Sequence, residues 1–205
     1  MQNNNLNLAD AEPQTSYKII PDGTIAKVKL HIKKGDYNDN AQGWTDDFAT
    51  QGQSGAVFLK CEYTIVEGEY EDQKVWSLIG LYSPKSDKYK QIGRSFMRGI
   101  CDSSSRLEPQ DKSTEANNIR NNFGFKELDG TVFLAKIEVK KDKDDNDKNV
   151  IRYAITKGHP EYDKLMGDKL KENGRYKIGE GKKEQEPDSD IEDDEIPFWD
   201  KIWLY

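Results

Sequence analysis

An alternation of apolar and polar residues, regular in one segment and interrupted by a few apolar residues in two others, constrains the fold of this chain more than any other feature. In residues 24–33, apolar and basic side chains take turns along the chain: Ala26, Lys27, Val28, Lys29, Leu30, His31, Ile32 and Lys33. The same period of two runs through residues 56–67 and 131–140. This period is that of a β-strand with one buried face. We therefore predict three half-buried strands, the first of which has a basic outer face.

Further elements complete the pattern. Residues 74–82 predict another strand, joined to 56–67 by a turn at 67–72 as a hairpin, and residues 150–156 predict a fifth after a charged loop at 141–149. Six residues share one helical stripe over 86–101: Tyr89, Ile92, Gly93, Phe96, Met97 and Ile100. Ser86 suits the N-cap of this helix. Short helices are expected at 114–121 and 161–172, a turn or edge strand at 174–177, and a long polar loop over 34–55.

The predicted order is strand, strand, strand, helix, strand, strand. This is the layout of a five-stranded OB-like Greek-key barrel with a helix between strands three and four, although a β-grasp or a split sheet has the same count. We therefore expect a mainly β fold with four regions. They are a flexible N-terminus (1–16), the OB-like domain (17–157), a C-terminal extension of it (158–182) and a disordered tail (183–205).

The charge is unevenly distributed between body and tail. Residues 183–205 carry nine acids and two bases, a net charge of 2 − 9 = −7. Residues 1–182 therefore hold 31 − 2 = 29 bases and 38 − 9 = 29 acids and are neutral overall. Because a neutral body can still present a basic face, the net charge does not exclude a nucleic-acid partner.

Several classes of protein are excluded by composition. No stretch approaches the roughly 18–20 apolar residues of a transmembrane helix, and the Asn-rich start, Met1 to Glu12, lacks the pattern of a secretory signal. Two cysteines, Cys61 and Cys101, form neither a disulfide framework nor a zinc motif. We therefore expect a cytoplasmic protein that needs no metal or cofactor and has no membrane partner.

The tail ends in an acidic run that closes on Ile-Pro-Phe: Asp190-Ile191-Glu192-Asp193-Asp194-Glu195-Ile196-Pro197-Phe198. This run resembles the C-terminal tip of bacterial and phage single-stranded-DNA-binding proteins, which is acidic and closes on Asp-Ile-Pro-Phe. The resemblance implies that Asp193, Asp194, Glu195, Ile196, Pro197 and Phe198 dock replication or recombination proteins. Seven residues follow Phe198 here, whereas the family tip ends on the Phe and uses its terminal carboxylate.

A second resemblance covers roughly residues 17–157. It rests on three turns joined to strands: Ile20-Pro21-Asp22-Gly23-Thr24, Val66-Glu67-Gly68-Glu69-Tyr70-Glu71-Asp72-Gln73-Lys74-Val75 and Leu128-Asp129-Gly130-Thr131-Val132-Phe133. These segments are similar to a phage family of formerly unknown function, found in replication and recombination gene neighbourhoods. The resemblance implies an OB-type protein that binds single-stranded DNA, and such proteins are often homo-oligomers.

Single-stranded nucleic acid is bound by cations along the phosphates and by aromatic rings under the bases. In an OB-fold the site crosses strands two and three and is flanked by the loops after strands one and four. The predicted contact residues follow this arrangement: Lys27, Lys29, Lys33, Trp44, Phe48, Phe58, Lys60, Trp76, Tyr82, Lys136, Arg152 and Tyr153. Phe58 and Trp76 fit equally well in the core, and a helical stripe of Lys90, Arg94 and Arg98 is more typical of a solvated surface.

No catalytic motif is present. The sequence lacks a Gly-rich phosphate loop, a Gly-x-Ser-x-Gly elbow and a His-Glu-x-x-His pair. An EF-hand beginning at Asp142 requires Gly and Glu where Asp147 and Tyr153 stand, so that loop is expected to be a charged hairpin tip. The sequence therefore predicts a non-enzymatic protein that binds and protects single-stranded DNA. An OB-like adaptor that binds only proteins, or a nuclease with a carboxylate site, remains as the alternative.

Overall fold

The computed structural model describes residues 18–167. Within this range the fold is mainly β, an open antiparallel sheet of seven strands with several helices. The elements run in this order: β1 (Ile25–Lys33), β2 (Tyr37–Asp39), η1 (Asn40–Gln42), β3 (Trp44–Gln51), β4 (Val57–Ile65), β5 (Lys74–Tyr82), α1 (Asp87–Ser104), α2 (Thr114–Asn121), α3 (Phe125–Leu128), β6 (Val132–Lys141), β7 (Asp147–Ile155) and α4 (Tyr162–Met166). The regions expected at 1–16 and 183–205 lie outside the described residues.

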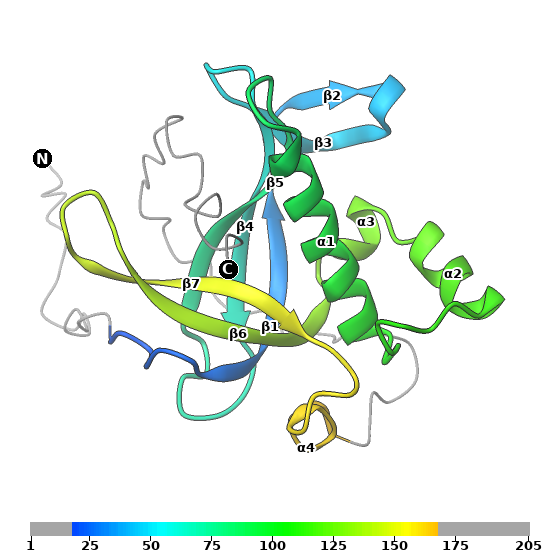
Figure 1. Cartoon of the computed structure of the whole chain (residues 1–205). Helices are drawn as coiled ribbons and strands as arrows, with labels where there is room; N and C mark the ends of the chain where they lie inside the picture. Colours follow the sequence, from blue (N-terminus) through cyan, green and yellow to red (C-terminus); the bar gives the residue numbers. More distant parts are fainter. Residues whose placement is uncertain (1–17, 168–205) are drawn as a thin grey trace, which may run out of the picture.

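The five predicted strands correspond to β1, β4, β5, β6 and β7, and they pair in the order β5–β4–β1–β6–β7. The short β2–β3 hairpin extends the sheet from β4. Along one edge of β4, residues 57–59 pair with β3 and residues 60–65 pair with β1. The β6–β7 hairpin crosses in front of β1 and β4 (Figure 1). β5 and β7 come near each other, but within residues 18–167 no ladder of hydrogen bonds joins them.

The alternation read from the sequence is confirmed. Val28, Leu30 and Ile32 of β1 are buried. So are all five apolar residues that alternate along β4: Val57, Leu59, Cys61, Tyr63 and Ile65. Phe133, Ala135 and Ile137 of β6 complete this inner face, which forms the main core. The lysines of β1 therefore lie on the opposite, outer face of the sheet.

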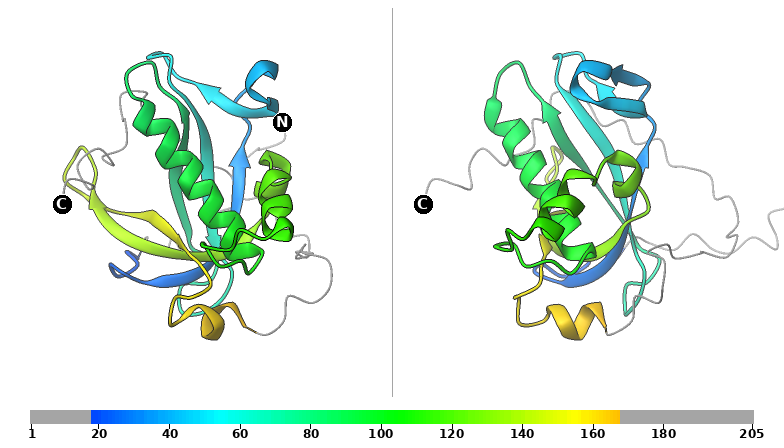
Figure 2. Two further views of the ribbon diagram at one scale, coloured as in Figure 1. Left: turned by 45° about the vertical axis from the view of Figure 1, so that its right-hand side comes forward. Right: turned by 90° about the vertical axis from the view of Figure 1, so that its right-hand side faces the viewer.

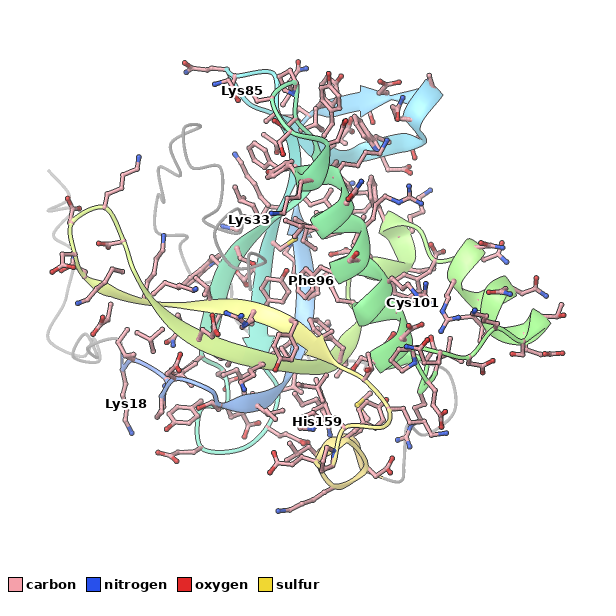
Figure 3. The ribbon with its side chains drawn as sticks, in the orientation of Figure 1. Lys18, Lys33, Lys85, Phe96, Cys101 and His159 are labelled. Atoms are coloured by element: carbon pink, nitrogen blue, oxygen red, sulfur yellow. The ribbon has the colours of Figure 1, made fainter. Side chains whose placement is uncertain are left out.

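Helix α1 covers the inner face, as the helical stripe predicted. Phe96 lies between α1 and the strands (Figure 3). Its ring packs edge to face on Phe133 of β6, with the ring centroids 6.4 Å apart. Gly93 brings the helix against β5, since a Cβ at that position would come within 1.8 Å of the Gly80 carbonyl oxygen. Ser86 is the N-cap residue, but its side chain makes no capping hydrogen bond.

The prediction of a long polar loop over residues 34–55 is wrong, because this segment contains β2, η1 and β3. Its strands were missed because three aspartates interrupt the alternation. Asp36, Asp46 and Asp47 adopt left-handed backbone conformations, with φ of 59°, 63° and 60°. Phe48, instead of lying in a loop, is buried in the core and packs edge to face on Phe125 at 6.3 Å. The hairpin is therefore anchored to α3.

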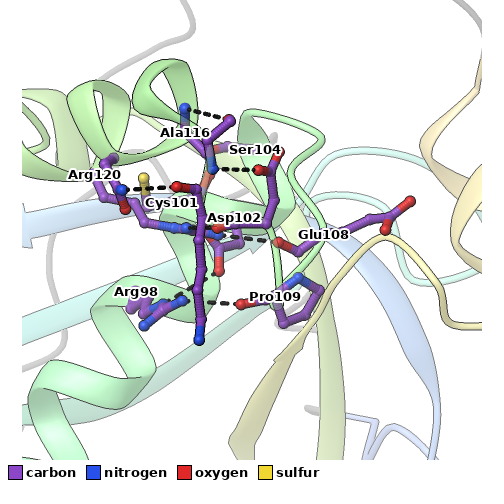
Figure 4. A network of polar contacts seen from close by, with 12 residues as sticks. Arg98, Cys101, Asp102, Ser104, Glu108, Pro109, Ala116 and Arg120 are labelled. Atoms are coloured by element: carbon purple, nitrogen blue, oxygen red, sulfur yellow. Dashed lines mark hydrogen bonds and ion pairs between the residues drawn. The ribbon is translucent and has the colours of Figure 1, made fainter.

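Helix α2 occupies the predicted residues 114–121 and is fastened to α1 by a buried carboxylate. Asp102 accepts a hydrogen bond from Arg120 Nε at 2.7 Å and lies 3.6 Å from Arg98 Nε (Figure 4). The two guanidinium groups also donate to the carbonyls of Glu108 and Pro109 in the connecting loop. With Asp102 only 2% exposed, this network is a structural tie between the two helices.

Helix α4 lies apart from α1–α3, at the end of β7 (Figure 2). It buries Tyr162 and Met166 against Leu134 and Ile155, with Ile25 packed alongside. These strand residues belong to the outer face, so α4 covers part of that face. The helix expected at 161–172 is therefore present as far as Met166, and the turn expected at 174–177 lies outside the described residues. No helix within 18–167 is long and apolar enough to cross a membrane.

Candidate nucleic-acid interface

Three rows of side chains cross the outer surface of β1, β4 and β5, which we call the β1–β4–β5 face. Directly opposed residues of antiparallel strands point to the same side of a sheet, so the strand register defines each row. The rows, in order along β1, are Lys33–Lys60–Leu78, His31–Glu62–Trp76 and Lys29–Thr64–Lys74. Four predicted contact residues, Lys29, Lys33, Lys60 and Trp76, are thus brought together on one surface.

Two lysines stand directly opposite each other in this face. Lys33 of β1 is paired with Lys60 of β4, and Lys29 lies four residues along on the same side. Like charges in directly opposed positions destabilise a sheet. Within residues 18–167, no carboxylate lies within ion-pair distance of these three lysines. The face therefore keeps a concentrated positive charge that an anion would neutralise.

An indole ring lies beside these lysines, in the central row. The Nε1 atom of Trp76 donates to Glu62 Oε2 at 3.2 Å across the β4–β5 pair, and Glu62 Oε1 is 3.1 Å from the ammonium of Lys74. The polar edge of the indole is thus satisfied while the ring stays half-buried at the surface. A ring fixed by its edge loses little further freedom when a base stacks on its face.

The opposite end of the central row is held in a similar way. His31 Nδ1 is 3.1 Å from Asp129 Oδ1, and the same carboxylate oxygen accepts the backbone N–H of Ile32 at 2.7 Å. The His31 side chain is 61% exposed. Asp129 therefore orients the ring from the edge of the face and leaves it in solvent between Lys29 and Lys33.

The remaining predicted cations and both predicted tyrosines lie outside the three rows. Lys27 lies on the same outer side of β1, but its side chain is only 11% exposed and pairs with Glu67 at 2.8 Å. Tyr82 is 45% exposed at the end of β5. Lys136, Arg152 and Tyr153 lie on the β6–β7 hairpin, where Arg152 is bound to Glu138 at 2.7 Å. They are outward-facing but do not border the three rows.

Two predicted aromatic contacts are inaccessible. Phe48 and Phe58 are each only 6% exposed, so neither offers a ring face to a base in this structure. Trp44 begins β3, is half-buried and packs against Tyr37 with ring centroids 6.3 Å apart. Because β3 joins the core through Phe48, Trp44 lies on a hairpin and not in the open loop that the sequence suggested.

The helical stripe is on the other side of the sheet. Arg98 is occupied by the carbonyl of Pro109 and by Asp102, and Lys90 and Arg94 belong to the same helix, which covers the inner face. The predicted hairpin tip at Asp142 closes on itself, because the Asp142 side chain accepts the N–H groups of Asp144 and Asn146. The tail residues 193–198 lie outside the described range.

Sequence reasoning missed Glu62. It occupies an outward position of β4 between Lys60 and Thr64, and an acid at such a position of a basic strand face is the signal that was available. Among the described residues no group of three or more His, Cys, Asp or Glu side chains is arranged to hold a metal ion. Neither a scan against models of known protein families nor a search of curated proteins returns a match for this chain.

Proposed function

We propose that this protein binds and protects single-stranded DNA, largely independently of sequence, on the β1–β4–β5 face. Such binding requires cations spaced along a backbone and ring faces for the bases, each stacked base contributing about 1–3 kcal/mol. Lys29, Lys33 and Lys60 supply the cations, and Trp76 supplies the ring. The lysine ammonium groups bind phosphates as point charges, which gives affinity without reading the base edges.

The observation that carries this proposal is the opposed pair Lys33–Lys60 next to Trp76. A solvated surface gains nothing from two lysines facing each other without a nearby carboxylate, because their repulsion costs stability. A polyanion turns this cost into binding energy. An aromatic ring in the adjacent row then distinguishes an unpaired strand, whose bases are free to stack, from a duplex.

We further propose that the body is an OB-type Greek-key barrel, open between β5 and β7. The strand succession β1, β4, β5, helix, β6, β7 agrees with this reading, with the β2–β3 hairpin inserted after the first strand. OB-folds bind oligonucleotides across strands two and three. Those strands are β4 and β5 here, and they carry Lys60 and Trp76.

The acidic tail completes the proposal. Its resemblance to the tip of single-stranded-DNA-binding proteins supports a role in recruiting replication or recombination proteins through Asp193 to Phe198. In this account the protein acts in the cytoplasm of a bacterium, encoded by the host or by a phage. In this account it is not an enzyme, and a homo-oligomer, frequent among single-stranded-DNA-binding proteins, is compatible with the same role.

The test is a titration of the full chain with oligo-dT, followed by intrinsic tryptophan fluorescence and repeated at several salt concentrations. The proposal expects quenching, with an affinity that falls as salt rises because counterions are released from the phosphates. Absence of binding at every salt concentration favours the protein-binding adaptor. Metal-dependent shortening of the oligonucleotide identifies a nuclease. Either result overturns the proposal.

A further inference from the structure

A second aromatic–cation pair lies on the β6–β7 hairpin. Lys136 and Tyr153 are paired in register, and the Lys136 ammonium is 5.9 Å from the centroid of the Tyr153 ring. Tyr153 is 41% exposed and belongs to a group of only three large hydrophobic side chains exposed within residues 18–167, with Tyr82 and Ile119. An exposed ring beside a cation is the combination that stacks a base and holds its phosphate.

This pair points to the same side of the sheet as Trp76. Trp76 is aligned through Glu62 with His31 of β1, and Tyr153 is aligned through Lys136 with Ile25 of β1. His31 and Ile25 are both odd-numbered positions of one regular strand, whose even positions Val28, Leu30 and Ile32 face the core. Both rings therefore lie on the outer surface.

Helix α4 separates the two rings. The outward positions between them on β6 and β7 are Leu134 and Ile155, and both are buried under Tyr162 and Met166. Lys27, the neighbouring outward position of β1, is only 11% exposed. A strand bound near Trp76 thus meets a covered region before it reaches Tyr153, and the two pairs are distinct places on one surface.

The separation can be worked out from the register. His31 and Ile25 are 31 − 25 = 6 residues apart, which is about 20 Å along a strand. A strand of DNA that stays on the outer surface crosses from β5 over β4, β1 and β6 to β7, which is four strand spacings or about 19 Å. The path over β4, β1 and β6 is therefore about 28 Å. A stacked strand advancing about 3.4 Å per nucleotide covers this path in about eight nucleotides.

We propose that Tyr153 and Lys136 form a second nucleotide-binding subsite, so that one DNA strand contacts the protein at two places separated by α4. This inference rests on the proposed function of the β1–β4–β5 face. It makes affinity depend on length in a specific way. A short strand binds at the three lysines beside Trp76, whereas a strand longer than about eight nucleotides also reaches Tyr153 and gains from the effective concentration of its tethered end.

The test compares oligo-dT of about 5 and about 15 nucleotides, lengths that lie within the range of OB-fold sites, on the full chain by fluorescence anisotropy of a labelled strand. Tyr153→Ala is expected to weaken the longer strand by about 5- to 150-fold, the loss of one stacked base, and to leave the shorter strand unchanged. Tyr153→Phe keeps the ring and is expected to bind both lengths normally. Trp76→Ala is expected to weaken both lengths.

Ile119→Ala is the matched control, because Ile119 is equally exposed, at 40%, on α2. Urea unfolding of each variant verifies that the fold is intact. If Tyr153→Ala leaves the longer strand unchanged while Trp76→Ala weakens it, the second subsite is overturned and the proposed function stands. Equal weakening of both lengths by Tyr153→Ala also overturns it, because it indicates one continuous site. If the wild-type chain binds neither length, the proposed function itself fails.

Discussion

The opposed lysines make a prediction that links stability to binding. In Lys33→Gln and Lys60→Gln the side-chain length is nearly kept while one charge of the pair is removed. Two ammonium groups about 7 Å apart repel each other by about 0.6 kcal/mol in water, within the range of about 0.2–1 kcal/mol for a cross-strand pair. Each single variant is therefore expected to have a free energy of unfolding about 0.5 kcal/mol higher than the wild type.

The double variant is expected to gain little more, because the first substitution already removes the repulsion. A double-mutant cycle then gives an unfavourable coupling between the two lysines. Binding changes in the opposite direction. Each lysine that contacts a phosphate contributes about 0.7 to the slope of log affinity against log salt for a single strand, so each variant is expected to bind more weakly and with a shallower slope.

Urea unfolding without DNA and oligo-dT titrations at several salt concentrations measure the two effects. Lys112→Gln is the control, since Lys112 is exposed in the loop between α1 and α2 and is expected to change neither quantity. The reasoning is refuted if Lys60→Gln lowers the free energy of unfolding. It is equally refuted if Lys33→Gln and Lys60→Gln bind DNA with the wild-type salt slope.

Three further predictions follow from the same structure. Trp76→Phe retains a ring and is expected to keep most of the affinity for oligo-dT while losing most of the fluorescence quenching; unchanged quenching would place the DNA elsewhere. Asp102→Asn removes the buried carboxylate that pairs with Arg120 and Arg98, and it is expected to lower the free energy of unfolding, measured with urea, by about 3 kcal/mol. Glu69→Gln, the control, breaks an exposed pair with Lys18 and is expected to change that free energy by less than about 0.5 kcal/mol. Burial raises the pKa of the Cys61 thiol from 9.0 to about 12. Above pH 9 the unfolded chain therefore releases a proton that the folded chain keeps. The free energy of unfolding is expected to fall with rising pH by up to about 1.4 kcal/mol per pH unit. Cys61→Ala is expected to lessen that fall, as measured by urea unfolding at several pH values.

The strands of the proposed interface were predictable, because apolar and polar residues alternate along most of their length. Val28, Leu30 and Ile32 mark the buried side of β1, and the lysines between them follow on the outer side without further information. The β2–β3 hairpin was not predictable, because its left-handed aspartates break the period. Its largest buried side chain, Phe48, packs on Phe125, a partner 125 − 48 = 77 residues away.

Which residues lie next to each other on the candidate site depends on the register between paired strands, and an alternating sequence does not reveal that register. Sequence alone placed Lys33 and Lys60 on outward faces but not opposite each other, and it left Trp76 and Phe58 equally suited to the core. Pairing with Glu62 leaves Trp76 at the surface, while Phe58 is buried at the crowded end of β4 where β3 and β5 both pair. Tertiary contacts, not local pattern, decided both.

The central claim is that DNA contacts the β1–β4–β5 face. The most direct measurement is the change in amide and indole NMR shifts as oligo-dT is added to the full chain. The account predicts the largest shift changes at the indole N–H of Trp76 and at the amides of Lys29, Lys33 and Lys60. The amide shifts of α1 and α2 are expected to change little. Changes centred on the helices, or none at saturating oligonucleotide, would contradict it.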